Sequence, residues 1–260
     1  MAKKVDYVFQ RIETKYLLTK TKQEEFLNEI EPYMQLDEYG LHTICNIYYD
    51  TPQYELIRRS IEKPKYKEKL RLRSYGVPDN SQEVYIEIKK KYQKVVYKRR
   101  EGVTMREADA YLNHGIKPSK DSQILHEIDY FMQHYKPEGK LFLAYDRMAY
   151  FGREDSSIRI TFDRNIRSRE YDLDLRKGDY GELLFENGEQ IMEIKVGQAM
   201  PIWLADSLAK LEIYPVSFSK YGRIYKQLRS ETGNRRSEEG EENKANIRES
   251  FGGIKICSQA

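Results

Sequence analysis

The sequence predicts an α+β fold in which an antiparallel β-sheet curls into a barrel and helices pack on its outside. Three observations predict this fold. Segments in which charged and apolar residues alternate recur along the chain, and each can form a strand with one charged and one apolar face. Segments with apolar residues at helical spacing lie between them. Tyrosine, which favours strands, is abundant, with 22 among 260 residues.

The clearest strand is 68–75, where Lys69, Arg71 and Arg73 alternate with leucines. One such strand could simply turn its charged face to water. The pattern returns elsewhere, however, with arginine, lysine and glutamate at similar relative positions, and a solvated face does not require that. The other segments that show it are 11–15, 84–90, 158–163 and 192–196. A barrel with a polar, cationic interior and apolar rows facing outer helices explains the repetition.

The remaining elements follow from hydrophobic periodicity and turn residues. Further strands are expected at 9–18, 41–49, 95–99 and 141–151, with short strands at 171–175 and 183–185. Helices are expected at 22–34, 53–60, 200–211 and 219–229. Residues 1–230 would then form one domain, with a helical insertion at about 104–134 that is too small to bury a core of its own. Residues 231–260 are charged and poor in apolar residues, which predicts a disordered tail.

The composition argues against several classes of protein. A net charge of +3 is too small to indicate a nucleic-acid binder. Cys45 and Cys257 lie far apart without a Cys/His cluster, which argues against structural zinc or a disulfide framework and favours a reducing compartment. No apolar run is long enough to span a membrane or to act as a leader. We therefore expect a cytoplasmic protein whose contact with a membrane, if any, depends on a membrane-protein partner.

Cationic side chains that converge inside a barrel suit a polyanion. The planar fork of arginine matches phosphate oxygens, and lysine adds point charges. Carboxylates in the same interior would oppose plain anion binding, but they fit a divalent metal ion that bridges phosphate oxygens. The pattern therefore predicts a metal-assisted triphosphate site.

Six short motifs follow one another along the chain, namely Arg71-Leu72-Arg73, Glu87-x-Lys89, Tyr145-x-Arg147, Arg159-x-x-x-Asp163, Glu193-x-Lys195 and Ser219-Lys220-Tyr221. They occur in the order seen in the VTC domain, the polyphosphate polymerase family of triphosphate tunnel metalloenzymes, and residues 8–228 resemble that family. The resemblance implies an eight-stranded antiparallel tunnel. It also implies transfer of the γ-phosphate of ATP onto a growing inorganic polyphosphate chain, with Mn²⁺ or Mg²⁺ as the cofactor.

The same resemblance implies a role for each matching residue. The side chains expected to act in phosphate transfer are Arg71, Arg73, Lys89, Arg147, Arg159 and Lys195. Those expected to bind phosphate or nucleotide are Lys15, Lys98, Tyr145, Ser219 and Lys220. Glu193 would hold the metal, and Glu13 and Glu87 are further candidates for this role.

One departure from the wider superfamily bears on Glu13. The first strand of thiamine-triphosphatases and class IV adenylyl cyclases contains Glu-x-Glu-x-Lys, whereas this chain has Arg11-x-Glu13-x-Lys15. The loss of one acidic ligand weakens a two-metal hydrolase or cyclase interpretation. It leaves Glu13 as either a metal ligand or an ion-pair partner that orients Arg11 or Lys15.

Other residues also have two interpretations. Lys98 lies in a basic run that could be a solvated strand edge. Ser219 could cap the last helix as well as bind phosphate, because helix N-termini attract anions. Asp163 could be a structural partner of Arg159 or Arg147.

Two other functions fit the same residues. A triphosphatase would hydrolyse inorganic triphosphate or a nucleoside triphosphate, and it differs from a polymerase only in using water as the acceptor. A non-catalytic polyphosphate-binding module would keep the cations without a metal. Because such a module would not need the expected metal ligand Glu193, which is present, we rank this alternative last.

Overall fold

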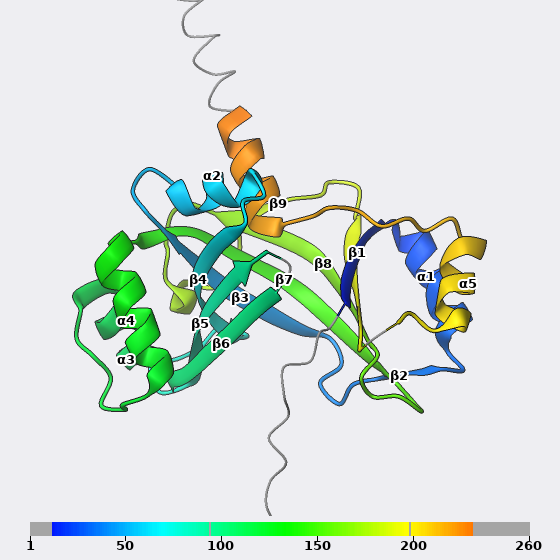
Figure 1. Cartoon of the computed structure of the whole chain (residues 1–260), viewed down its shortest axis with the longest axis horizontal. Coiled ribbons are helices and arrows are strands. Elements are labelled where there is room, and N and C mark those ends of the chain that lie inside the picture. Colours follow the sequence, from blue (N-terminus) through cyan, green and yellow to red (C-terminus); the bar gives the residue numbers. More distant parts are fainter. Residues whose placement is uncertain (1–11, 94, 198, 231–260) are drawn as a thin grey trace, which may run out of the picture.

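The computed structural model describes residues 12–93, 95–197 and 199–230, and Figure 1 shows a single strongly curved sheet with helices around it. The strands are β1 Ile12–Leu18, β2 Met34–Leu36, β3 His42–Asp50, β4 Tyr66–Tyr75, β5 Glu83–Tyr92, β6 Val95–Thr104, β7 Glu138–Gly152, β8 Arg159–Arg169, β9 Glu182–Leu183 and β10 Gln190–Val196. The helices are α1 Lys20–Ile30, α2 Glu55–Ile61, α3 Met105–His114, α4 Gln123–Tyr135 and α5 Ile202–Lys210, and residues 220–230 are also helical.

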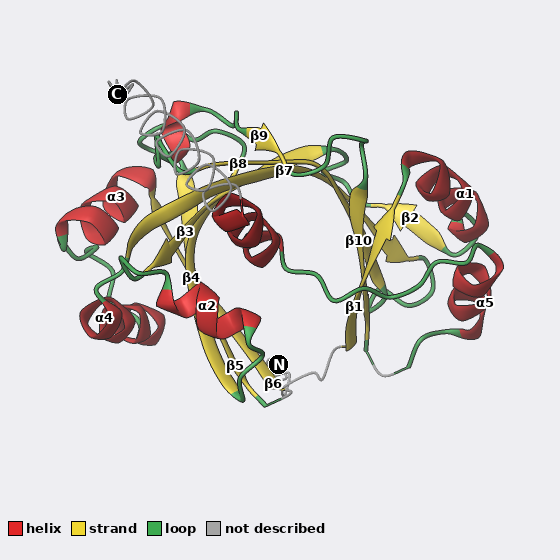
Figure 2. Cartoon of the chain, turned by 90° about the horizontal axis from the view of Figure 1, so that it is seen from above, coloured by secondary structure: helices red, strands yellow, loops and turns green. Residues whose placement is uncertain are grey.

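Eight strands follow one another through antiparallel pairs in the order β1-β10-β8-β7-β3-β4-β5-β6. The short strands β2 and β9 pair with β7 and β8 outside this path. The predicted α+β class and the eight antiparallel strands are therefore confirmed. Within the described residues, β1 and β6 are not paired with each other, and Figure 2 shows the sheet as an arch. The sheet is a half-barrel.

The apolar rows of the strands face outward, as predicted. Leu70 and Leu72 of β4 are buried in a cluster with residues of α3 and α4. At the other end of the arch, Ile194 of β10 lies in a second cluster with residues of α1 and α5. Each helix pair thus covers one flank of the convex face (Figure 2). Helix α3 starts at a capping box, in which the Thr104 side chain and N3 glutamate satisfy each other's backbone N–H groups.

The helix 220–230 differs from the others, because it lies inside the arch (Figure 2). Tyr221 and Ile224 are buried in a third apolar cluster with Leu141, Leu143 and Ile191 of the concave, inner face. Tyr221 also donates a hydrogen bond of 3.1 Å to Asp50 Oδ2. Part of the inner face is therefore apolar and covered by this helix, and the charged residues occupy the rest.

The predicted strand at 171–175 is wrong. Arg169, at the end of β8, donates hydrogen bonds to the backbone carbonyl groups of Asp172, Gly178 and Tyr180. These carbonyl groups bind a side chain instead of a neighbouring strand. Asp172 also has a positive φ of 46°, which interrupts an extended backbone. The segment is therefore a loop with a short 3₁₀ turn at Leu175–Lys177.

Other expectations were met or fell short by a few residues. The predicted helices within 104–134 are present as α3 and α4. The strand β2 was not expected, and β8 continues six residues beyond the predicted end at 163. The one-domain assignment of residues 1–230 stays a prediction, and the proposed tail at 231–260 lies outside the described residues. Among the helices in the described ranges, none has the length and apolar character to cross a membrane.

Candidate functional site

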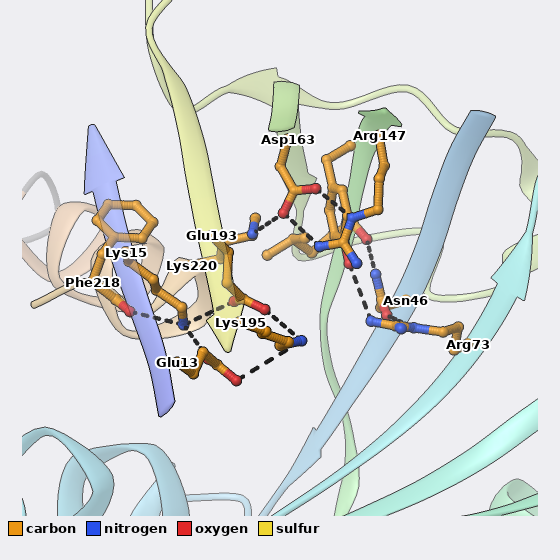
Figure 3. Close-up of polar contacts among 12 residues, drawn as sticks. Glu13, Lys15, Asn46, Arg73, Arg147, Asp163, Glu193, Lys195, Phe218 and Lys220 are labelled. Carbon is orange, nitrogen blue, oxygen red and sulfur yellow. Dashed lines mark hydrogen bonds and ion pairs between the residues drawn. The ribbon is translucent and has the colours of Figure 1, made fainter. Parts of the chain in front are cut away.

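A quartet of alternating charges lies where β1 pairs with β10. Glu13 is directly opposite Lys195, and Lys15 is directly opposite Glu193. Glu193 forms ion pairs with both lysines, with 2.6 Å from Oε1 to Lys195 Nζ and 3.6 Å from Oε2 to Lys15 Nζ. Glu13 is 3.4 Å from Lys15 and 3.9 Å from Lys195 (Figure 3). Glu13 is thus an ion-pair partner of Lys15, which was one of its two expected roles; Arg11 lies outside the described residues.

The quartet keeps Glu193 ionised. Burial alone would raise the pKa of Glu193, but the charges of Lys195 and Lys15 outweigh it and lower the pKa to about 2. Burial would likewise lower the pKa of Lys15, and Glu193 and Glu13 raise it above its ordinary value instead. At neutral pH Glu193 is therefore ionised and Lys15 is protonated.

Glu87 of β5 collects a second group of cations. Arg71 donates to its Oε2 through Nε at 2.6 Å, Arg71 Nη2 lies 2.6 Å from the same oxygen, and Arg73 Nε lies 3.8 Å from it. Lys98 of β6 approaches Oε1 at 3.0 Å. Glu87 is only 2% exposed; burial would raise its pKa, but these three cations lower it to about 2. Because three cations enclose it, Glu87 fits a charge partner of the arginines better than a metal ligand.

Asp163 of β8 holds a third group. Arg147 of β7 binds it through two hydrogen bonds, Nε to Oδ1 at 2.6 Å and Nη2 to Oδ2 at 2.8 Å. Lys220 donates to Oδ2 at 2.5 Å, which ties the start of the helix 220–230 to the inner face (Figure 3). Asp163 is fully buried; burial would raise its pKa, but Arg147 and Lys220 hold it well below its usual range. The expected partner of Asp163 is therefore Arg147 and not Arg159.

Neutral side chains orient the two arginines of β4. Arg73 donates to Asn46 Oδ1 at 3.0 Å and to the Tyr145 hydroxyl at 3.1 Å. Arg71 donates to the Tyr48 hydroxyl at 3.2 Å. The sequence predicted Tyr145 but missed Asn46 and Tyr48. Both belong to β3, which is buried on both faces. Its sequence therefore does not alternate between charged and apolar residues, and that pattern could not identify the residues that face inward.

Lys69 and Lys89 lie directly opposite each other on β4 and β5. Neither forms an ion pair with a carboxylate in the described part of the chain, and Lys69 Nζ donates only to Ser219 Oγ, at 3.4 Å. Burial lowers the pKa of Lys69 to about 8, and desolvation on the inner face also lowers the pKa of Lys89. Among the described residues these two lysines therefore have no carboxylate within ion-pair distance, although the charge of Glu13 partly offsets the effect of burial on Lys89. Lys69 was part of the predicted charged row but had been given no role.

Arg159 and Ser219 lie at the margins of the site. Arg159 is directly opposite Lys195, but it is exposed and its Nη2 lies 3.7 Å from Asp37 Oδ2. Ser219 Oγ accepts from the backbone N–H of Gly222 at 3.3 Å, so Ser219 caps the helix 220–230. Its hydroxyl therefore takes part in a helix N-terminus that lies beside Lys69.

The predicted site residues thus come from seven strands and from the start of the helix 220–230, and they lie on the inner face or at its margin. Only Glu13 and Glu193 lie in the quartet as carboxylates, and the described residues contain no cluster of three or more histidines, cysteines or acids that could hold a metal. Two ionised carboxylates still fit Mg²⁺ or Mn²⁺, because Mg²⁺ is commonly held by one or two carboxylates together with phosphate oxygens and water. The donor set is therefore suited to a metal that arrives with a phosphorylated substrate.

Comparison with known proteins agrees with the fold described above. The model of the VTC domain matches residues 10–229. A putative adenylate cyclase from Bacillus halodurans is 14% identical with a TM-score of 0.51, and the match covers 80% of this chain and 93% of that chain. A putative adenylyl cyclase from Hippeastrum, described as having a dominant triphosphatase activity, is 15% identical with a TM-score of 0.50, and the match covers 84% and 96% of the two chains. No curated protein matches the sequence significantly. At these identities the structural likeness concerns the fold.

Proposed function

The chain belongs to the VTC domain family, and we propose that it is a polyphosphate polymerase. It would transfer the γ-phosphate of ATP onto a growing inorganic polyphosphate chain with the help of a divalent metal ion. The observation that supports this proposal is the gathering of arginines and lysines from separate strands on one face of the sheet. Such an array suits several phosphates in series better than a single anion.

The arginines are positioned before any substrate binds. A guanidinium has five N–H donors, and the protein contacts of Arg71 engage Nε, Nη1 and Nη2 once each. Donors therefore remain for phosphate oxygens while Glu87 and Tyr48 fix the plane of the group. Lys69 and Lys89 add further cations, and neither forms an ion pair with a carboxylate among the described residues. A phosphate chain would meet a fixed array of donors.

Glu193 and Glu13 are the residues that would hold the metal. Both carboxylates belong to the quartet, and the low pKa of Glu193, about 2, keeps its oxygens available as ligands at neutral pH. A bound Mn²⁺ or Mg²⁺ would neutralise negative charge on the phosphate oxygens. Lys15 and Lys195, which share these carboxylates in the free protein, would then be released to donate to phosphate.

Phosphate transfer of this kind depends on positioning and charge neutralisation, and it requires no protein nucleophile. Lys220 and Arg147 are both held by Asp163, so they present a fixed pair of cations beside Tyr145. The acceptor phosphate chain and the nucleotide would be aligned by such fixed groups along the inner face. For the reaction to be polymerisation, the group that accepts the transferred phosphate must be a phosphate chain and not water.

A triphosphatase is the second candidate. The Hippeastrum protein, described as having a dominant triphosphatase activity, has the same fold. The cations and carboxylates described above would serve hydrolysis equally well, because both reactions would bind the triphosphate of the nucleotide in the same way. The two functions differ in the product, which is polyphosphate in one case and orthophosphate in the other.

The test is to incubate the full chain with ATP and Mn²⁺ and to resolve the products on a gel stained for polyphosphate, with free phosphate measured in parallel. The proposal predicts a ladder of polyphosphate that is lost in Arg71→Ala and Glu193→Ala. Arg99→Ala and Glu24→Ala are matched controls, because Arg99 pairs with Glu127 of α4 and Glu24 pairs with Lys20 on the surface of α1. Free phosphate without polymer would replace the polymerase by the triphosphatase.

A further inference from the structure

Aromatic rings form a continuous row beside the charged residues. Ring centroids are 6.2 Å apart for Tyr39 and His42, 6.1 Å for His42 and Tyr75, and 5.9 Å for Tyr75 and Tyr85. The guanidinium of Arg100 lies 4.6 Å from the centre of the Tyr85 ring. These separations are those of interacting aromatic pairs and of a cation–π contact. We call these five residues the aromatic row.

The aromatic row lies on the same face as the candidate site. His42 is directly opposite Arg147, and Tyr85 is directly opposite Arg73. Directly opposed residues of antiparallel strands share a face of the sheet. Tyr75 follows Arg73 by two residues on β4, which places their Cα atoms roughly 6.8 Å apart. The row therefore begins level with Arg73 and Arg147 and extends beyond them to Tyr75 and Tyr39.

The row is exposed and locally fixed. Tyr39 is 70% exposed and Tyr75 is 51% exposed, and neither belongs to an apolar cluster in the described part of the molecule. The Tyr85 hydroxyl donates to Glu83 at 2.5 Å, which holds that ring. Gly76, directly after Tyr75, has a φ of +76°, a conformation in which glycine is favoured. Burial of apolar surface does not account for several rings at such positions.

From this placement we infer that the aromatic row stacks the purine base of a bound nucleoside triphosphate. The inference rests on the proposed function, since it names how the site would hold the nucleoside end of its substrate. Every base has a π-face that can stack on an aromatic side chain, and Arg100 can add a cation–π contact. Uncharged rings would add little to the affinity for a phosphate chain, whereas the paired ions near Arg73 would add little to the affinity for a base. The triphosphate would lie along the cations, and the base would lie on Tyr75 and Tyr39.

The test compares a ligand that has a base with one that lacks it. Calorimetry on the full chain in Mg²⁺ would give the Kd of ATP and the Kd of inorganic tripolyphosphate. Tyr75→Ala and Tyr39→Ala should raise the ratio of the ATP Kd to the tripolyphosphate Kd by about 5-fold to 150-fold for a lost stacking contact. Tyr75→Phe should keep the ratio of the wild type. Tyr97→Ala is the matched control, because Tyr97 is also exposed on β6 but has the opposite parity to Arg100.

The outcomes separate the inference from the proposed function. If wild type binds both ligands and the tyrosine variants leave the ratio unchanged, the inference is overturned and the triphosphate site stands. If wild type binds neither ligand, the proposed function is overturned and the inference with it. Should Tyr75→Ala fail to fold, Tyr39→Ala gives the answer alone, because Tyr39 lies in an exposed connection before β3.

Discussion

Arg147 binds Asp163 through two hydrogen bonds, of 2.6 Å from Nε to Oδ1 and 2.8 Å from Nη2 to Oδ2. Asp163 is fully buried, so this cation is fixed to the inner face by a carboxylate that water does not reach. Arg71 is held by Glu87, and Lys195 by Glu193, each at 2.6 Å. These cations of the candidate site are therefore positioned by carboxylates before a substrate is present.

The first prediction concerns Asp163→Asn. This change removes the carboxylate but leaves Arg147 and Lys220 on the inner face without a counter-charge. Removing one partner of a buried ion pair costs about 3–5 kcal/mol, and we expect the free energy of unfolding to fall by that amount. Urea denaturation measures it. Asp206→Asn, on the exposed surface of α5, is the control; a loss for Asp163→Asn as small as that of the control would contradict the role of Asp163.

The second prediction concerns acid stability. The folded-state pKa of Glu193 is lowered from 4.5 to about 2, because Lys195 and Lys15 outweigh the effect of burial. A lowered carboxylate pKa stabilises the fold above pH 4.5, and this stabilisation is lost as the pH falls towards 2. The stability of wild type relative to Glu193→Gln should therefore shrink by about 1–2 kcal/mol between pH 6 and pH 3. Urea denaturation at both pH values measures the difference, and parallel pH profiles would refute it.

The alternation of charge predicted the inner row of β4 because the two-residue period is local to a strand. The pairing of charges could not be predicted in the same way. Lys220 and Asp163 are 57 residues apart, and only the packing of the helix 220–230 brings them together. An amphipathic pattern also does not say whether a helix covers the outer or the inner face, and this helix covers the inner one.

The third prediction concerns binding between pH 7 and pH 9. Burial lowers the pKa of Lys69 to about 8, so Lys69 is a cation at pH 7 and largely neutral at pH 9. The affinity for tripolyphosphate, measured by calorimetry, should therefore fall as the pH rises through 8. Lys69→Arg keeps the charge throughout this range and should reduce the fall. An unchanged pH profile in Lys69→Arg would show that Lys69 does not bind the anion.

The fourth prediction concerns the metal. If Glu193 and Glu13 hold Mn²⁺, Glu193→Gln should weaken Mn²⁺ binding roughly tenfold or more, since it removes one charged oxygen ligand. Titration of free Mn²⁺ by electron paramagnetic resonance measures this in the presence of tripolyphosphate. Glu24→Gln on the surface of α1 is the control. Equal Mn²⁺ affinities in wild type and Glu193→Gln would remove Glu193 from the metal site.

Phosphorus-31 NMR of the full chain incubated with ATP and Mg²⁺ distinguishes a polymerase from a triphosphatase by the phosphates that form. A polymerase produces phosphates that are bonded on both sides, and their internal resonances should grow as the γ-phosphate signal of ATP declines. We expect these internal resonances in wild type and their absence in Arg71→Ala. Growth of orthophosphate alone would contradict the polymerase, because water would then be the acceptor.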